Sequence, residues 1–210
     1  MAQFSQRMIR AAKLDPALYE EVEADRNALG QAMGVVVLSS VAAGLGTSFH
    51  GSVGGIVGGA VAALIGWFVW AFLTYAIGTK ILPEPQTQAD LGQLLRATGF
   101  ASAPGIIRIL AVIPGVGGLI FLIAMIWMLI AMVISIRQAL DYTSTLRAVG
   151  VCVIGWLVQV VMIFVLFSMM GVPIATIESE SGTDDNLTAF CPRFVSILLR
   201  TRNLPIFPKL

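Results

Sequence analysis

The chain alternates long apolar runs with short polar segments, and the runs are long enough to form membrane-crossing helices. A helix needs about 20 apolar residues to cross the hydrocarbon core of a bilayer, and it satisfies its own backbone hydrogen bonds there. The runs lie at residues 29–47, 54–77, 99–113, 118–136 and 148–170. The pattern therefore predicts an all-α fold, a polytopic membrane bundle of five transmembrane helices.

The third and fourth runs form one apolar stretch that is too long for a single span. Pro104 and Pro114 divide it, and we interpret residues 114–118 as a turn between two spans. The third run would reach only roughly 22 Å as a helix, against a core of about 30 Å. We therefore expect a kinked or tilted third span. The alternative is a re-entrant loop, which would leave four spans and bring both termini to the same side.

The polar segments predict the rest of the layout. Residues 3–14 form an amphipathic pattern, with Phe4 and Met8 on one face and basic residues near the other, so we expect a helix in the headgroup plane. The alternative is a frayed N-terminus. Residues 79–98 read as a polar loop that ends in a short surface helix capped by Asp90.

These segments divide the chain into three parts. We expect a cytoplasmic amphipathic segment at residues 1–28, a membrane domain at residues 29–170 and a flexible tail at residues 171–210. With the N-terminus inside, the inner segments before the tail hold eight lysines and arginines, and the two short outer loops hold none. Because cytoplasmic loops carry the positive excess, we expect a cytoplasmic N-terminus and an external C-terminus.

The composition excludes several classes of function. Charged residues make up 12% of the chain, about half of what a soluble domain carries, and the net charge is only +1. No basic surface is available for nucleic acid, so we expect no nucleic-acid partner. One histidine and two cysteines, Cys152 and Cys191, have no catalytic or metal-binding spacing. We expect no catalytic residue, no metal and no cofactor, and a protein that is not an enzyme.

Two polar residues lie within the apolar runs and are candidate intramembrane sites. A cation at membrane depth costs about 2.5–3.5 kcal/mol on insertion scales, so Arg108 either snorkels or pairs structurally, or it binds a substrate or a lipid headgroup. Gln159 is expected to hydrogen-bond across helices.

Small residues recur every four positions along the second run. Gly55 and Gly59 share one ridge, and Gly58 and Gly66 share the adjacent one. Such ridges let helices approach closely in lipid, where packing replaces the hydrophobic drive. We expect these four glycines to be helix-packing residues.

Three segments together resemble the Yip domain family, the Ypt-interacting proteins, in its bacterial branch. They are DPALYEEVEADRNALGQA, GFASAPGIIRIL and IWMLIAMVISIRQALDYTSTLRAVGVCVIGW. The resemblance covers roughly residues 7–170. It implies five spans and a cytosolic N-terminus, and eukaryotic members bind Rab GTPases and partner membrane proteins in vesicle traffic. The tyrosine- and glycine-rich motifs of those members are missing here, so no site residue carries over.

The two functional hypotheses differ in class. The first is a non-enzymatic scaffold or adaptor in a bacterial inner membrane, whose partners are the lipid bilayer and other membrane proteins or a second copy. Binding of a small GTPase is implied by the resemblance alone. The second is a small-solute transporter or channel subunit that uses Arg108 and the broken third span as its polar site.

Overall fold

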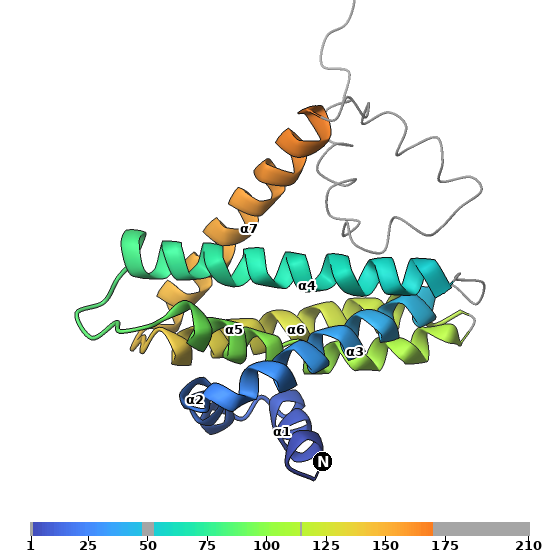
Figure 1. The fold of residues 1–210 in the computed structure, drawn as a ribbon, viewed down its shortest axis with the longest axis horizontal. Helices are drawn as coiled ribbons and strands as arrows, with labels where there is room; N and C mark the ends of the chain where they lie inside the picture. The colour runs from blue at the N-terminus through green and yellow to red at the C-terminus, as the bar shows by residue number, and fades with distance from the viewer. Residues whose placement is uncertain (1, 48–52, 114, 170–210) are drawn as a thin grey trace, which may run out of the picture.

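The computed structural model describes residues 2–47, 53–113 and 115–169. The expected tail at residues 171–210 lies outside them. Within the described residues the chain is helical and has no strand. The α-helices are α1 (Ala2–Ala12), α2 (Pro16–Ala24), α3 (Leu29–Thr47), α4 (Val53–Ala76), α5 (Leu91–Phe100), α6 (Gly117–Ala139) and α7 (Thr145–Met169) (Figure 1). Three other helical segments are η1 (Arg26–Ala28), the π-helix η2 (Ile77–Ile81) and the 3₁₀ helix η3 (Ala103–Val112).

Five helical stretches are long and apolar enough to cross a membrane, which confirms the predicted all-α bundle. They are Arg26–Gly46, Val57–Ile81, Leu91–Val112, Gly117–Ala139 and Thr145–Met162. In Figure 1, α3, α4, α6 and the stretch from α5 to η3 run along one direction. Helix α7 crosses them at a steep angle, and α1 and α2 cover the side of the bundle away from α4.

The third span begins earlier than expected: the predicted helix capped by Asp90 is present, but its expected surface position is wrong. Helix α5 starts at Leu91 with an Asp90–Gln93 capping box, and every residue from Leu94 to Phe100 is buried. It packs against α2, α3, α4 and α6. The charge of Arg96 suggested a surface position, but its guanidinium donates to the carbonyl oxygens of Val22 and Glu23.

Helix α5 and η3 together are long enough to cross a hydrocarbon core of about 30 Å, which residues 99–113 alone were not. Ten α-helical residues rise about 15 Å, and ten residues of 3₁₀ helix rise about 20 Å. The kink lies between Phe100 and Ala103, where Pro104 occupies the first turn of η3. Both α5 and η3 contact α6, so this stretch follows the bundle from end to end and is not re-entrant.

The closest backbone packing joins α3 to the third span at three glycines that the repeat pattern did not indicate. A Cβ at Gly46 would collide with the carbonyl oxygen of Arg108. One at Gly99 would lie 2.7 Å from Ala32 Cβ, and one at Gly105 would collide with Ser39 Oγ of α3 and lie 2.7 Å from both Arg108 Nη2 and Met128 Sδ. Small residues therefore set the distance between α3 and η3, as expected for helices that associate in lipid.

Two glycines of the α4 ridges, Gly58 and Gly59, do not pack against another helix within the part of the chain that the structure describes. Gly58 and Gly59 are exposed, and a Cβ on either would meet no described atom within 4 Å. Gly66 is half-buried, and the surroundings of Gly55 lie outside the described side chains. The helix-packing role of the four glycines stays a prediction.

Helix α1, expected to lie in the headgroup plane, packs on the rest of the protein. Its arginines Arg7 and Arg10 face acidic side chains and not lipid headgroups. Arg7 pairs with Glu21 and Asp25, each at 2.9 Å, and Arg10 pairs with Asp15 at 2.8 Å. Arg7 is 5% exposed. The acidic residues after α1 therefore neutralise the charges that the sequence pattern assigned to the membrane surface.

Substitution at Gly105 should destabilise the protein, whereas the same change at Gly58 should not. Gly105→Ala forces Ser39 of α3 to shift, together with Arg108 and Met128, and overpacking of this kind costs about 1–3 kcal/mol. We expect a melting temperature lower by about 2–10 °C in detergent, with Gly58→Ala as the matched control at the parent value. Equal melting temperatures for the two variants would contradict the packing of α3 on η3.

Candidate interaction face at the loop end

One end of the bundle gathers the polar side chains. There α3, α5 and α7 begin, and α4 and α6 end (Figure 1). We call this the loop end. Two connections cross it: residues 82–90 between η2 and α5, and residues 140–144 between α6 and α7.

A carboxylate in the first connection holds the second. The Glu84 side chain is 5% exposed and accepts hydrogen bonds from the backbone N–H of Thr143 at 3.0 Å and from Thr143 Oγ1 at 2.9 Å. Arg147 Nε lies 3.5 Å from Glu84 Oε1. Gln86 Nε2 donates to the same carboxylate and to the carbonyl oxygen of Asp141.

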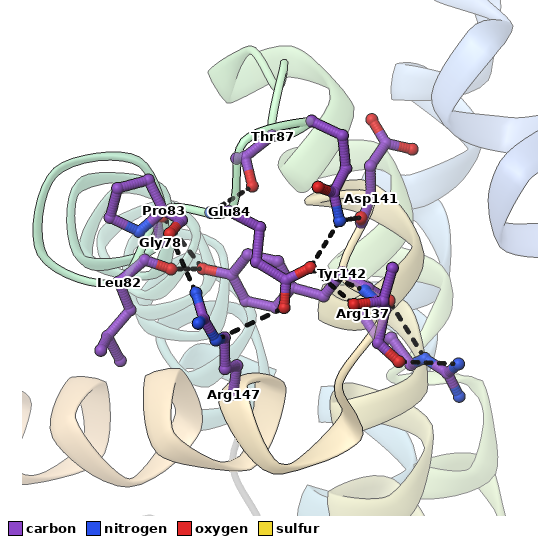
Figure 2. Close-up of polar contacts among 11 residues, drawn as sticks. Gly78, Leu82, Pro83, Glu84, Thr87, Arg137, Asp141, Tyr142 and Arg147 are labelled. Atoms are coloured by element: carbon purple, nitrogen blue, oxygen red, sulfur yellow. Dashed lines mark hydrogen bonds and ion pairs between the residues drawn. The ribbon is translucent and has the colours of Figure 1, made fainter.

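A tyrosine from the second connection reaches back to the end of α4. The hydroxyl of Tyr142 lies 3.0 Å from the carbonyl oxygen of Gly78 and 2.7 Å from that of Leu82 (Figure 2). The π-helical turn presents the Gly78 carbonyl, and the Leu82 carbonyl follows directly after that turn. Gly78 has no room for a side chain, because a Cβ there would collide with Leu140. We call Glu84, Gln86, Tyr142, Thr143 and Arg147 the polar clasp.

The hydrogen bonds of the polar clasp fix its protonation states. The backbone amide of Thr143 is the main cause that lowers the pKa of Glu84 below its usual value. Burial raises the pKa of Tyr142, and the charge of Glu84 adds to this. At neutral pH the carboxylate is therefore charged and accepts, while the phenol is neutral and donates.

Helix α2 is attached to the same end of the bundle. Leu18, Tyr19 and Val22 are fully buried, and Gln138 Nε2 donates to Glu20 Oε1 at 2.9 Å. Buried Arg96 holds the C-terminal carbonyls of α2, which a helix end otherwise leaves unpaired.

The carboxylate of Glu23, at the end of α2, is buried in a way that disfavours its charged form. Burial raises its pKa to about 7, with further increases from Asp141 and Glu20, while Arg96 opposes them. Its Oε2 atom has no hydrogen-bond partner among the described residues.

Arg108 lies inside the bundle and pairs with α3. Its Nη2 atom donates to Ser39 Oγ at 2.7 Å and to the Ser39 carbonyl at 3.2 Å, and its Nε donates to the carbonyl of Gly105 at 2.9 Å. These hydrogen bonds match the hypothesis that Arg108 pairs structurally with other residues of the bundle.

Gln159 does not join Arg108 at a common site. It lies on α7, is half-buried, and its carbonyl oxygen has no partner in the described part of the chain. The apolar hollow between α3, α4 and α5 is lined by neither residue. Among the described residues, no group of three or more His, Cys, Asp or Glu side chains could hold a metal ion.

Sequence reasoning missed the polar clasp. Glu84 stands between Pro83 and Pro85, which marks a stiff loop and nothing more. Its partner Thr143 lies 59 residues away, and no local pattern links the two positions.

The pairing of Arg108 with Ser39 predicts a coupled effect on stability. Ser39→Ala should cost about 1–3 kcal/mol in the parent and little in an Arg108→Met background, because the charged donor is then absent. The neighbouring Ser40→Ala is the control, since its hydroxyl donates to Val37 of its own helix. Additive shifts in melting temperature for Ser39→Ala and Arg108→Met would contradict the pairing.

The environment of Glu23 predicts that stability falls as the pH rises. The folded protein holds this proton more tightly than the unfolded chain, whose pKa is near 4.5, so the destabilisation develops between about pH 4.5 and pH 7. We expect the melting temperature to decrease over this range and Glu23→Gln to reduce the decrease. Glu20→Gln should keep most of it, because burial is the main cause. An unchanged slope in Glu23→Gln would rule out Glu23 as the source.

The comparisons with known proteins show the family of the chain. Neither the curated proteins nor the solved structures include a match to the chain. The family model of the Yip1 domain matches residues 17–168, which run from α2 to the end region of α7 and include the polar clasp. The chain belongs to the Yip1 domain family and is a multi-pass membrane protein.

Proposed function

We propose that this protein is a non-enzymatic scaffold or adaptor that binds partner proteins through its loop end. In this proposal the loop end faces the cytoplasm of a bacterial inner membrane. The observation that carries it is the Glu84 carboxylate, which is buried in a surface connection and bonded to residue 143.

Such a loop is already ordered before a partner arrives. Ordering a backbone residue costs about 1–2 kcal/mol, and a binding surface that has met this cost in the free protein gains affinity. The polar clasp fixes the connection at residues 82–90, and its neighbours Pro83, Pro85 and Gln88 are exposed. The result is a fixed surface with no catalytic group, which fits a binding role.

The interior supports a scaffold better than a transporter. A transport site near the bilayer midplane needs polar groups that are free to bind a solute. Arg108 donates from Nε and Nη2 to Gly105 and Ser39 within the bundle, and Gln159 lies on another helix, so the two do not form a common polar site. No observation in the described residues favours the transporter alternative.

A photo-crosslinking amino acid at Gln88 tests the proposal in native membranes. We expect discrete protein adducts at this position and none at Leu119, an exposed control residue in the first turn of α6 at the other end. Glu84→Ala should reduce the Gln88 adducts about fivefold, because the loop loses its preorganisation. Tyr142→Phe provides a second, milder variant.

Two outcomes would overturn the proposal. One is the same adduct pattern at Gln88 and Leu119, which would mean random collisions in the membrane. The other is an adduct yield at Gln88 that does not change when either polar clasp variant is introduced into a protein with parent-like helix content.

A further inference from the structure

An apolar groove opens on the side of the bundle between three helices. Its volume is about 380 Å³, within the range of about 300–1,000 Å³ of small-ligand pockets. Helices α3, α4 and α5, which form it, contact one another pairwise. The lining side chains are Leu29, Met33, Leu64, Ile65, Phe68 and Leu95, with the ring of Trp67.

The chemistry of the groove selects a hydrocarbon chain. The only polar atom among these side chains is the indole nitrogen of Trp67, and its N–H already donates to Thr98 Oγ1 at 3.2 Å. A polar solute would therefore find no hydrogen-bond partner. Met33, Ile65 and Phe68 are 42–60% exposed and lie within candidate membrane spans, so the groove opens towards lipid.

Arg26 lies on the loop-end side of the groove, in η1 just before α3. Arg26, Gly30 and Met33 are all exposed; Arg26 lies in η1, which runs directly into α3, and Gly30 and Met33 are three residues apart on one face of α3. Three steps of 3₁₀ helix and four of α-helix rise about 12 Å, so Arg26 lies about this far along the chain direction from Met33, towards the loop end. Gly30 has no side chain between them, and a Cβ there would meet no described atom.

Arg26 is also available for a ligand. It has no ion pair among the described residues, whereas Arg7, Arg10 and Arg147 are all paired. The adjacent carboxylate of Asp25 is occupied by Arg7 Nη2 at 2.9 Å. A guanidinium binds phosphate oxygens in a bidentate geometry, and basic residues beside spans attract anionic lipids.

We infer that this groove binds one anionic phospholipid from the loop-end leaflet, with its phosphate on Arg26 and one acyl chain between α3, α4 and α5. The inference does not depend on the proposed scaffold function, because it rests on the groove and on Arg26 alone.

The test uses the full chain purified in detergent and native mass spectrometry with two phospholipids of identical chains, phosphatidylglycerol and phosphatidylcholine. We expect the parent to retain phosphatidylglycerol preferentially. Arg26→Gln should lower its retention about fivefold, while Lys80→Gln, another exposed cation at the loop end, should not. Met33→Trp should fill the groove and weaken retention of both lipids.

The matched control for Met33→Trp is Leu38→Trp. Leu38 lies on the same helix, is 43% exposed against 42% for Met33, and does not line the groove. Ile65→Trp replaces Met33→Trp if that variant does not fold.

The remaining outcomes overturn the inference. Equal lipid retention by the parent, Arg26→Gln and Met33→Trp would exclude the site. Loss with Arg26→Gln but not with Met33→Trp or Ile65→Trp would place the lipid on the surface, outside the groove. Equal displacement of both lipids by a free fatty acid, with no role for Arg26, would make the occupant a chain without a phosphate. A Met33→Trp variant that changes the dimer population instead would assign the groove to a second copy.

Discussion

The structure depends on one constraint: lipid offers no hydrogen-bond partner, so a polar group inside the bundle can be satisfied only by another group of the chain. Arg108 meets this constraint through Ser39 and Gly105. Trp67 meets it through Thr98 on the third span. The bonds of Arg108 to Ser39 and of Trp67 to Thr98 each join two helices that lipid would otherwise not hold together, so satisfying these polar atoms also fixes the arrangement of the helices.

Close approach of backbones makes these bonds possible. Gly46, Gly99 and Gly105 leave the space in which η3 lies against α3, and the guanidinium of Arg108 fits at that contact because Gly105 has no side chain. The 3₁₀ geometry of η3 contributes as well, since its longer rise lets a short, proline-containing segment complete the third span. Gly58 and Gly59 of α4 are exposed, and among the described residues no atom lies within 4 Å of where their Cβ atoms would be.

The same constraint shapes the loop end. Tyr142 satisfies carbonyl oxygens at the π-helical end of α4, and Glu84 satisfies the turn between α6 and α7. Arg96 does the same for the C-terminal end of α2. These bonds convert three chain connections into one fixed surface. This fixed surface is the basis of the binding role proposed for this Yip1 family member.

The sequence by itself determined the class of the protein, the number of spans and the family, because apolar run length and segment layout are local properties of the chain. It also singled out Arg108, since a cation in an apolar run is visible without a structure. The tertiary structure alone decided that Arg108 pairs with Ser39, that Arg96 is buried and that Glu84 binds residue 143, because each partner lies 59 to 74 residues away along the chain. It also decided which glycines pack, because a four-residue repeat shows that a ridge exists but not which helix, if any, lies opposite it.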